Sequence, residues 1–145
     1  MKQLENIFSK TKTKSKQSCP NPKTPIIIDK RENQSLIKAN LIERKANIQE
    51  EILQIGDYLI NETIIERKTF KDFTASLTDK RLFSQIQEMK KYRTSYLILE
   101  GFDFTYKSRL HPNAIRGAIL SSAKLIPIIY TEDENDTTKF LIQIA

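Results

Sequence analysis

The sequence is poor in the residues that build disulfide frameworks and transition-metal sites. Its 145 residues include one cysteine, Cys19, and one histidine, His111. A single cysteine excludes an internal disulfide, and this pair excludes both a zinc site built from cysteine and histidine and a catalytic triad with two histidines. If the protein uses a metal, carboxylates must hold it.

Long apolar segments are also absent. The longest apolar runs, 25–28 and 125–130, are far shorter than the ~20 residues that span a bilayer. No apolar region follows the N-terminal lysines, so these residues do not resemble a secretory signal. We therefore expect no membrane partner and a soluble, intracellular, cytoplasmic protein.

Charge is distributed unevenly along the chain. The sequence holds 24 Lys and Arg against 18 Asp and Glu, a net charge of +6 that favours a polyanionic partner. Residues 1–24 contain six lysines and one glutamate, which leaves a net charge of only +1 for residues 25–145. Because residues 9–24 lack large apolar side chains, we predict a flexible basic arm over 1–24 and a single folded domain over 25–145.

From Pro25 onward, strand-like and helix-like patterns alternate. We expect six strands and about five helices, which predicts an α/β domain with a mixed sheet. The expected strands cover 26–29, 46–53 near a sheet edge, 57–60, 63–68, 96–100 and 126–130. The expected helices lie around 36–41, over 70–77, from a cap at Thr78 through 89, over 112–123, and after a capping box formed by Thr131 and Glu134.

A hairpin at the centre of the chain carries the main functional prediction. A two-residue turn at 61–62 would place Asp57 opposite Glu66, where like charges repel. A divalent cation such as Mg²⁺ would relieve that repulsion. Alternation puts Lys68 on the same face as Glu66 and turns Arg67 away. Two alternatives remain: a longer turn would shift the register, and residues 66–68 could form a solvated strand end whose charges pair among themselves.

These residues carry a family resemblance. Gly56-Asp57-Tyr58, followed by Glu66-Arg67-Lys68 and Asp72, resembles the GD…ERK…D signature of the XPF family of structure-specific nucleases. Segment 27–32 resembles the family's opening strand, 79–85 its DGRLxxQ helix start, and 111–118 the archaeal Hef nucleases. The resemblance covers about 120 residues. It implies a restriction-endonuclease-like core that cuts branched DNA, such as flaps and forks, with Mg²⁺ or Mn²⁺ in repair or fork processing.

The resemblance also implies residue roles. Asp57 and Glu66 would hold the metal, and Lys68 would act at the attacking water. The remaining candidates are a supporting role for Arg67, a third acidic group at Asp29, phosphate contacts from Lys30, Arg31 and Arg81, and Asp72, which a capping box with Thr69 explains equally well. For two other carboxylates we favour simpler interpretations: Glu32 would pair with Arg31, and Glu100 would be a solvated strand end.

The resemblance also implies which partners such a domain would have and which competing interpretations remain. Family members commonly carry tandem helix-hairpin-helix repeats, but the three glycines, Gly56, Gly101 and Gly117, all fall within the nuclease-like region. We therefore expect an excised domain or a small subunit that dimerises with itself or another chain through the surface around Gly117 and uses a separate helix-hairpin-helix or helicase partner to bind DNA. The alternatives are a non-catalytic scaffold or DNA-binding subunit, and a nuclease of the same fold with another substrate.

Overall fold

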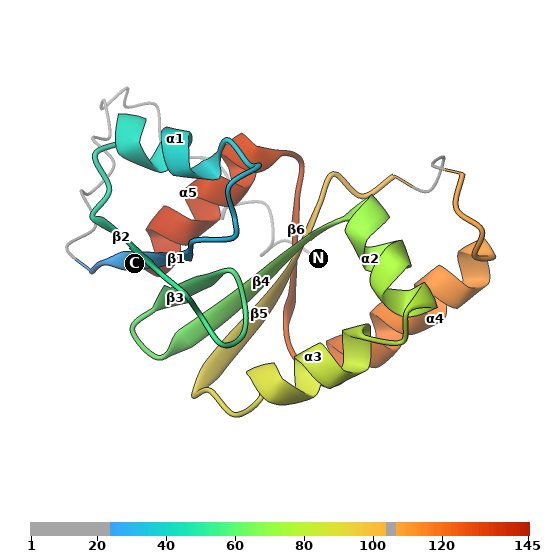
Figure 1. The fold of residues 1–145 in the computed structure, drawn as a ribbon. Coiled ribbons are helices and arrows are strands. Elements are labelled where there is room, and N and C mark those ends of the chain that lie inside the picture. Colours follow the sequence, from blue (N-terminus) through green and yellow to red (C-terminus); the bar gives the residue numbers. More distant parts are fainter. Residues whose placement is uncertain (1–23, 104–106) are drawn as a thin grey trace, which may run out of the picture.

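The computed structural model describes residues 24–103 and 107–145 as a single α/β unit (Figure 1). All six strands and all five helices expected from the sequence are present in these residues. The predicted basic arm lies outside them, apart from Thr24. In chain order the elements are β1 (Ile26–Asp29), α1 (Ile37–Glu43), β2 (Ile48–Glu51), β3 (Tyr58–Ile60), β4 (Thr63–Thr69), α2 (Phe70–Thr78), α3 (Leu82–Met89), β5 (Thr94–Glu100), α4 (Pro112–Ala123), β6 (Ile128–Thr131) and α5 (Glu134–Ile144).

The strands form one mixed sheet in the order β2-β1-β3-β4-β5-β6. Strands β4, β5 and β6 run parallel, as do β1 and β2, while β3 is antiparallel to both of its neighbours. Helices α1 and α5 cover one face, and α2, α3 and α4 cover the other (Figure 1). Among the described residues, no helix is long and apolar enough to cross a membrane.

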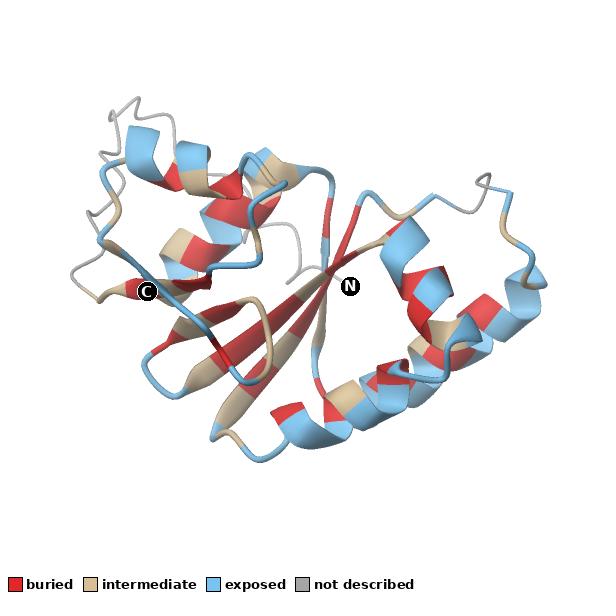
Figure 2. Ribbon diagram, in the orientation of Figure 1, coloured by how far each residue is buried: buried red, intermediate tan, exposed pale blue. Residues whose placement is uncertain are grey.

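Each face of the sheet has its own apolar core. Ile64 of β4 belongs to the core beneath α2, α3 and α4, whereas Ile65 belongs to the core beneath α1 and α5. Figure 2 shows the central strands buried and the outward faces of the helices exposed. Because side chains alternate along a strand, Glu66 and Lys68 share the face of Ile64, and Arg67 shares the face of Ile65.

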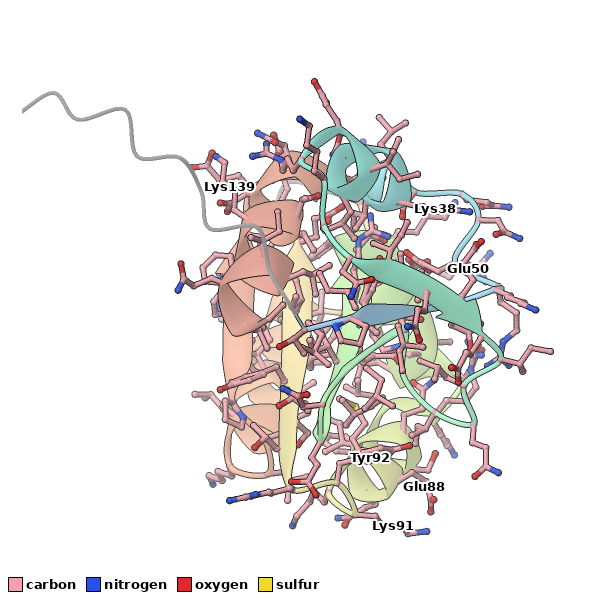
Figure 3. All side chains as sticks on the ribbon, turned by 90° about the vertical axis from the view of Figure 1, so that its left-hand side faces the viewer. Lys38, Glu50, Glu88, Lys91, Tyr92 and Lys139 are labelled. Atoms are coloured by element: carbon pink, nitrogen blue, oxygen red, sulfur yellow. The ribbon has the colours of Figure 1, made fainter. Side chains whose placement is uncertain are left out.

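The predicted sheet edge is confirmed. Strand β2 pairs only with β1 and contributes no fully buried side chain, in keeping with the polar residues 49–51. It is shorter than the 46–53 expected, because pairing with the four residues of β1 ends at Glu51. An ion pair of 2.7 Å between Lys38 of α1 and Glu50 ties helix and edge strand together at the surface (Figure 3).

Two expected helix starts are wrong and one is confirmed. Helix α3 does not start from a cap at Thr78, because Thr78 ends α2 and Lys80, at φ +59°, separates the two helices. The N-cap of α5 is Asp133 rather than Thr131, whose hydroxyl instead lies 2.7 Å from that of Thr137. Helix α4 covers 112–123 as expected, and its N-cap is His111, which accepts a hydrogen bond from the backbone N–H of Asn113.

Candidate active site

A two-residue turn at 61–62 implies four facing pairs along the hairpin, from 60 with 63 to 57 with 66, and the structure confirms three of them. Tyr58 faces Ile65, Leu59 faces Ile64 and Ile60 faces Thr63. The fourth predicted pair is wrong, because the ladder stops at Tyr58 and the N–H of Asp57 donates to the carbonyl of Ile65, one residue short of Glu66.

The reason for that departure lies at Gly56. Its φ of +74° turns the chain just before the strand, and a Cβ at this position would lie 2.7 Å from the side chain of Ile64. A residue with a side chain would be both strained and crowded here. Gly56 therefore lets the chain bend so that Asp57 lies at the end of the hairpin rather than within it.

Asp57 remains close to Glu66 despite the missing pair. Burial, followed by the negative charge of Glu66, raises the pKa of Asp57 to about 8. The backbone N–H of Arg67 donates to Oδ2 of Asp57 over 2.8 Å and opposes that rise only in part. Without a neighbouring cation, burial and the charge of Glu66 therefore make the charged form of Asp57 unfavourable. The like-charge repulsion predicted from the sequence is present.

Glu66 and Lys68 form a buried pair on the same face of β4, as alternation predicts. Nζ of Lys68 lies 2.8 Å from Oε1 of Glu66. Lys68 is 6% exposed and Glu66 is 9% exposed. The alternative of a solvated strand end is therefore wrong for these two residues, although their charges do pair with each other. A buried ion pair is costly to form, so its position beside Asp57 favours a chemical role.

These carboxylates suit a hard divalent cation. Among residues 24–103 and 107–145, no cluster of three or more acidic, cysteine or histidine side chains is arranged for a metal. Mg²⁺ commonly uses only one or two carboxylates, together with waters and substrate phosphates. Asp57 and Glu66 offer that donor set, and a cation between them would replace the proton that Asp57 otherwise retains.

Comparisons with known proteins identify the family of the chain. Residues 28–144 match the family model of the ERCC4 domain, the nuclease domain of XPF-type proteins. The chain belongs to this family. It is 32% identical over 127 residues to the 3′-flap repair endonuclease Xpf of Saccharolobus solfataricus, covering 83% of this chain and 54% of that protein. It is 46% identical over 129 residues to a Methanocaldococcus jannaschii protein provisionally named an ATP-dependent RNA helicase, covering 86% of this chain and 16% of that protein.

Solved XPF structures have the same fold. XPF from Aeropyrum pernix, both by itself and in complex with DNA, superposes with a TM-score of 0.75 at 29% identity. The match covers 83% or 84% of this chain and 63% of the solved chain. The predicted restriction-endonuclease-like core of an XPF-type domain is therefore confirmed. This chain spans less than two thirds of the length of each of these relatives.

Asp29 of this ERCC4 domain lies next to Asp57 but is already engaged. Its N–H donates to the carbonyl of Asp57, while its carboxylate accepts bonds of 2.8 Å from the side chain and N–H of Arg31 and from the N–H of Leu53. The Arg31 guanidinium holds the pKa of Asp29 well below its usual range. The structure therefore places the expected third acidic group in an ion pair.

Arg67 is oriented away from Glu66 and Lys68, as predicted, and joins β4 to β5, to α5 and to the loop after β1. Its guanidinium binds both carboxylate oxygens of Glu100 in β5, and it reaches Glu32 over 2.9 Å and Glu134 of α5 over 3.4 Å. Glu100 also accepts a hydrogen bond of 2.7 Å from the hydroxyl of Thr137. We call these five side chains the Arg67 network.

The Arg67 network corrects two expectations. Glu100 is buried rather than solvated, and Glu32 pairs with Arg67 rather than with Arg31. Although burial disfavours its charge, the bonds to Glu100 raise the pKa of Arg67, which stays cationic. Sequence reasoning missed Glu100 and Glu134 because their roles depend on the parallel pairing of β4 with β5 and on the docking of α5. The one sequence feature that could have indicated Glu100 is its position as a carboxylate at the end of an apolar strand.

Asp72 and the expected DNA contacts lie at the surface. Asp72 completes the cap of α2, with its N–H accepted by the hydroxyl of Thr69 over 3.2 Å, and it lines a cavity of about 320 Å³ together with Arg31 and Arg67. Arg81 is exposed and pairs with Asp79 over 3.0 Å, and Lys30 is exposed directly after β1. Only Arg31 of the three predicted phosphate ligands lines that cavity.

Proposed function

We propose that this chain is a metal-dependent DNA endonuclease that hydrolyses phosphodiester bonds at branches such as flaps and forks, using Mg²⁺ or Mn²⁺. The observation that carries the proposal is the buried Glu66–Lys68 pair beside an Asp57 whose pKa is raised. Two carboxylates and an ammonium group at one end of a hairpin are groups that metal-assisted hydrolysis can use. Homologous DNA repair endonucleases support the same class of reaction.

In this proposal each group at the hairpin has a distinct task. Asp57 and Glu66 hold the cation, and the Arg67 N–H orients the Asp57 carboxylate. The bound cation would lower the pKa of a water molecule and polarise the phosphate. Lys68 has three donor hydrogens, of which Glu66 accepts one. The others can position the attacking water or offset negative charge that develops on the phosphate oxygens.

Branched DNA is the proposed substrate because of the relatives. The Saccharolobus solfataricus relative is named a 3′-flap repair endonuclease, and the Aeropyrum pernix protein was solved in complex with DNA. A role inside the cell, in association with DNA, fits such a substrate. The retained Asp57, Glu66 and Lys68 favour this proposal over a non-catalytic scaffold or DNA-binding subunit.

We further propose that the domain works as a homodimer or heterodimer through α4. Leu120 is 66% exposed, and among the described residues nothing lies within 4 Å of a Cβ placed on Gly117. The close packing expected at Gly117 is therefore not made within the described part of the chain, which leaves that helix face available to a second chain. A helicase or helix-hairpin-helix partner would supply further DNA binding, as the helicase name of one relative suggests.

The direct test is cleavage of end-labelled 3′-flap, fork and linear duplex DNAs by the purified chain, with Mg²⁺, with Mn²⁺ and with chelator. We expect metal-dependent cuts near the branch and little cutting of the linear duplex. Cutting of all three DNAs at equal rates would contradict the substrate class. The absence of cutting in any metal would contradict the nuclease assignment and favour the scaffold.

A further inference from the structure

A second charged feature lies beside the proposed active site, between α2 and the segment that leads into α4. It is a groove of about 290 Å³, which we call the basic groove. Its lining combines one face of α2 with residues 107–109 of the facing segment. The lining residues are Lys71, Thr74, Ala75, Thr78, Lys107, Ser108 and Arg109.

The charge of the basic groove is positive and locally uncompensated. Lys71, Lys107 and Arg109 are exposed, no carboxylate is among the lining residues, and no ion pair joins any of the three cations to another residue of the described chain. By contrast, the cavity at Asp72 includes Glu32 and Glu134 as well. In a domain whose residues 25–145 carry a net charge of only +1, three cations around one groove that form no ion pair with another described residue indicate an anionic ligand.

The shape of the groove favours a chain of phosphates over a single small anion. Positions 71, 74, 75 and 78 follow one face of α2 and extend about 10 Å along the helix axis. The hydroxyls of Thr74 and Thr78 donate to carbonyls of α2 itself, so their hydrogens are already used within the helix. Ser108 accepts the N–H of Leu110, which leaves its own hydroxyl hydrogen to donate to a ligand.

The position of the groove connects it with the catalytic strand. Helix α2 begins directly after β4, so Lys71 is three residues beyond Lys68 and one residue before Asp72. A nucleic acid strand that places one phosphate at Asp57 and Glu66 can therefore continue along α2. Nothing in the sequence predicted this second site, because Lys71 and residues 107–109 are about 35 positions apart and meet only in the folded chain.

We propose that the basic groove binds the phosphodiester backbone of the DNA strand that continues from the scissile phosphate. This inference rests on the proposed function for its choice of DNA as the ligand. It adds a strand-holding site outside the hairpin and assigns Lys71, Lys107 and Arg109 as phosphate contacts. Because the contacts are to the backbone, they add affinity without sequence preference.

The test is the salt dependence of DNA binding by the full chain, measured by fluorescence anisotropy in chelator so that no cleavage occurs. The variant combines Lys71→Ala, Lys107→Ala and Arg109→Ala. Its control combines Lys90→Ala, Lys124→Ala and Lys139→Ala, which remove the same charge. Lys90 and Lys124 precede β5 and β6, which run parallel to β4, so these lysines lie at the opposite end of the strands from the end of β4. Lys139 lies on α5 (Figure 3).

We expect the groove variant to bind single-stranded DNA more weakly than the control and to reduce the slope of log K against log salt by about 2, roughly 0.7 for each lost phosphate contact. Equal slopes and equal affinities for the groove variant and the control would overturn the proposal. Thermal melting of both variants by circular dichroism checks that they fold. If the groove variant is unfolded, Arg109→Gln alone replaces it, with an expected slope reduction of roughly 0.7.

A second measurement separates this inference from the proposed function. Uncharged methylphosphonate linkages are placed singly along the DNA strand, and binding is measured again in chelator. Methylphosphonates at particular positions should weaken DNA binding by the wild-type protein but leave the affinity of the groove variant unchanged. That result supports the groove even if the protein never cuts DNA, whereas equal sensitivity of both proteins at every linkage would overturn it, even if cleavage is normal.

Discussion

At the scale of single residues, Asp57 is the group whose behaviour most clearly separates a catalytic site from a structural one. Its pKa is raised to about 8 because it is buried near Glu66. In the unfolded chain the carboxyl has its ordinary pKa near 3.8. Between these two values the folded chain binds more protons than the unfolded one, so the free energy of unfolding falls as pH rises. The charged form of Asp57, which would bind the metal, therefore lowers the stability of the fold.

We therefore predict a pH-dependent stability that a single substitution removes. In chelator, the unfolding free energy of the wild type should drop by on the order of 1 to 3 kcal/mol between about pH 4 and pH 8 through this carboxyl, allowing for partial solvent screening. Asp57→Asn should lack this contribution and be the more stable protein at pH 8. Urea denaturation at pH 5 and pH 8 measures both. Identical pH dependence in wild type and Asp57→Asn would contradict the assignment.

Predictions for single residues were right where strand alternation sets the direction of the side chain, and wrong where a bend in the backbone sets its position. Glu66 and Lys68 share a face because side-chain direction has a period of two. Asp57 lies outside the β3–β4 ladder because Gly56 adopts a positive φ. Counting residues across the hairpin could not predict that bend. The partners of Arg67 could not be foreseen, because they come from a loop, a strand and a helix that are distant from it in the sequence.

At the scale of elements, the Arg67 network fastens β4, β5 and α5 together on the face opposite the proposed chemistry. We predict unequal costs for two matched substitutions in it. Glu100→Gln breaks a buried pair and should lower the unfolding free energy by about 3 to 5 kcal/mol, because Arg67 is left without its main partner. Glu134→Gln, whose side chain is 28% exposed, should cost less than about 1 kcal/mol. Equal losses in urea denaturation would contradict the central role of Glu100.

Helix α4 offers a second element-scale test. Gly117 lies inside the helix with open space around it, so Gly117→Ala should raise the unfolding free energy of the monomer by roughly 0.5 to 1 kcal/mol. If α4 is the dimer surface, Leu120→Glu should shift the chain toward monomer in sedimentation equilibrium, whereas Glu88→Gln on α3 should not. Unchanged self-association of a dimeric chain in Leu120→Glu would rule out this surface.

Most elements could be predicted because apolar periodicity and capping residues are local signals. The exceptions have local causes as well. Lys80, with its positive φ, separates α2 from α3, so α3 cannot begin from a cap at Thr78. Asp133 caps α5 in place of Thr131, because the hydroxyl of Thr131 is bonded to that of Thr137. The parallel order of β4, β5 and β6 is a long-range property and left no pattern in the sequence that we could interpret.

At the scale of the whole molecule, the sheet separates two sets of charges. The Arg67 network lies on the face covered by α1 and α5, while Glu66 and Lys68 lie on the face covered by α2, α3 and α4. Because β4 leads directly into α2, the proposed metal ligands and the basic groove fall on the same side of the domain. Composition indicated a basic protein, but only the fold shows where a nearly neutral body concentrates positive charge.

The measurement that tests the account most directly is the single-turnover rate of flap cleavage in Mg²⁺ by the wild type, Glu66→Gln and Glu62→Gln. Both substitutions neutralise a glutamate of the same hairpin, but Glu62 is exposed and pairs with Arg93, whereas Glu66 is buried with Lys68. If Glu66 holds the metal, we expect a rate reduction of at least ~100-fold for Glu66→Gln and less than about twofold for Glu62→Gln. A folded Glu66→Gln protein that cuts at the wild-type rate would contradict it.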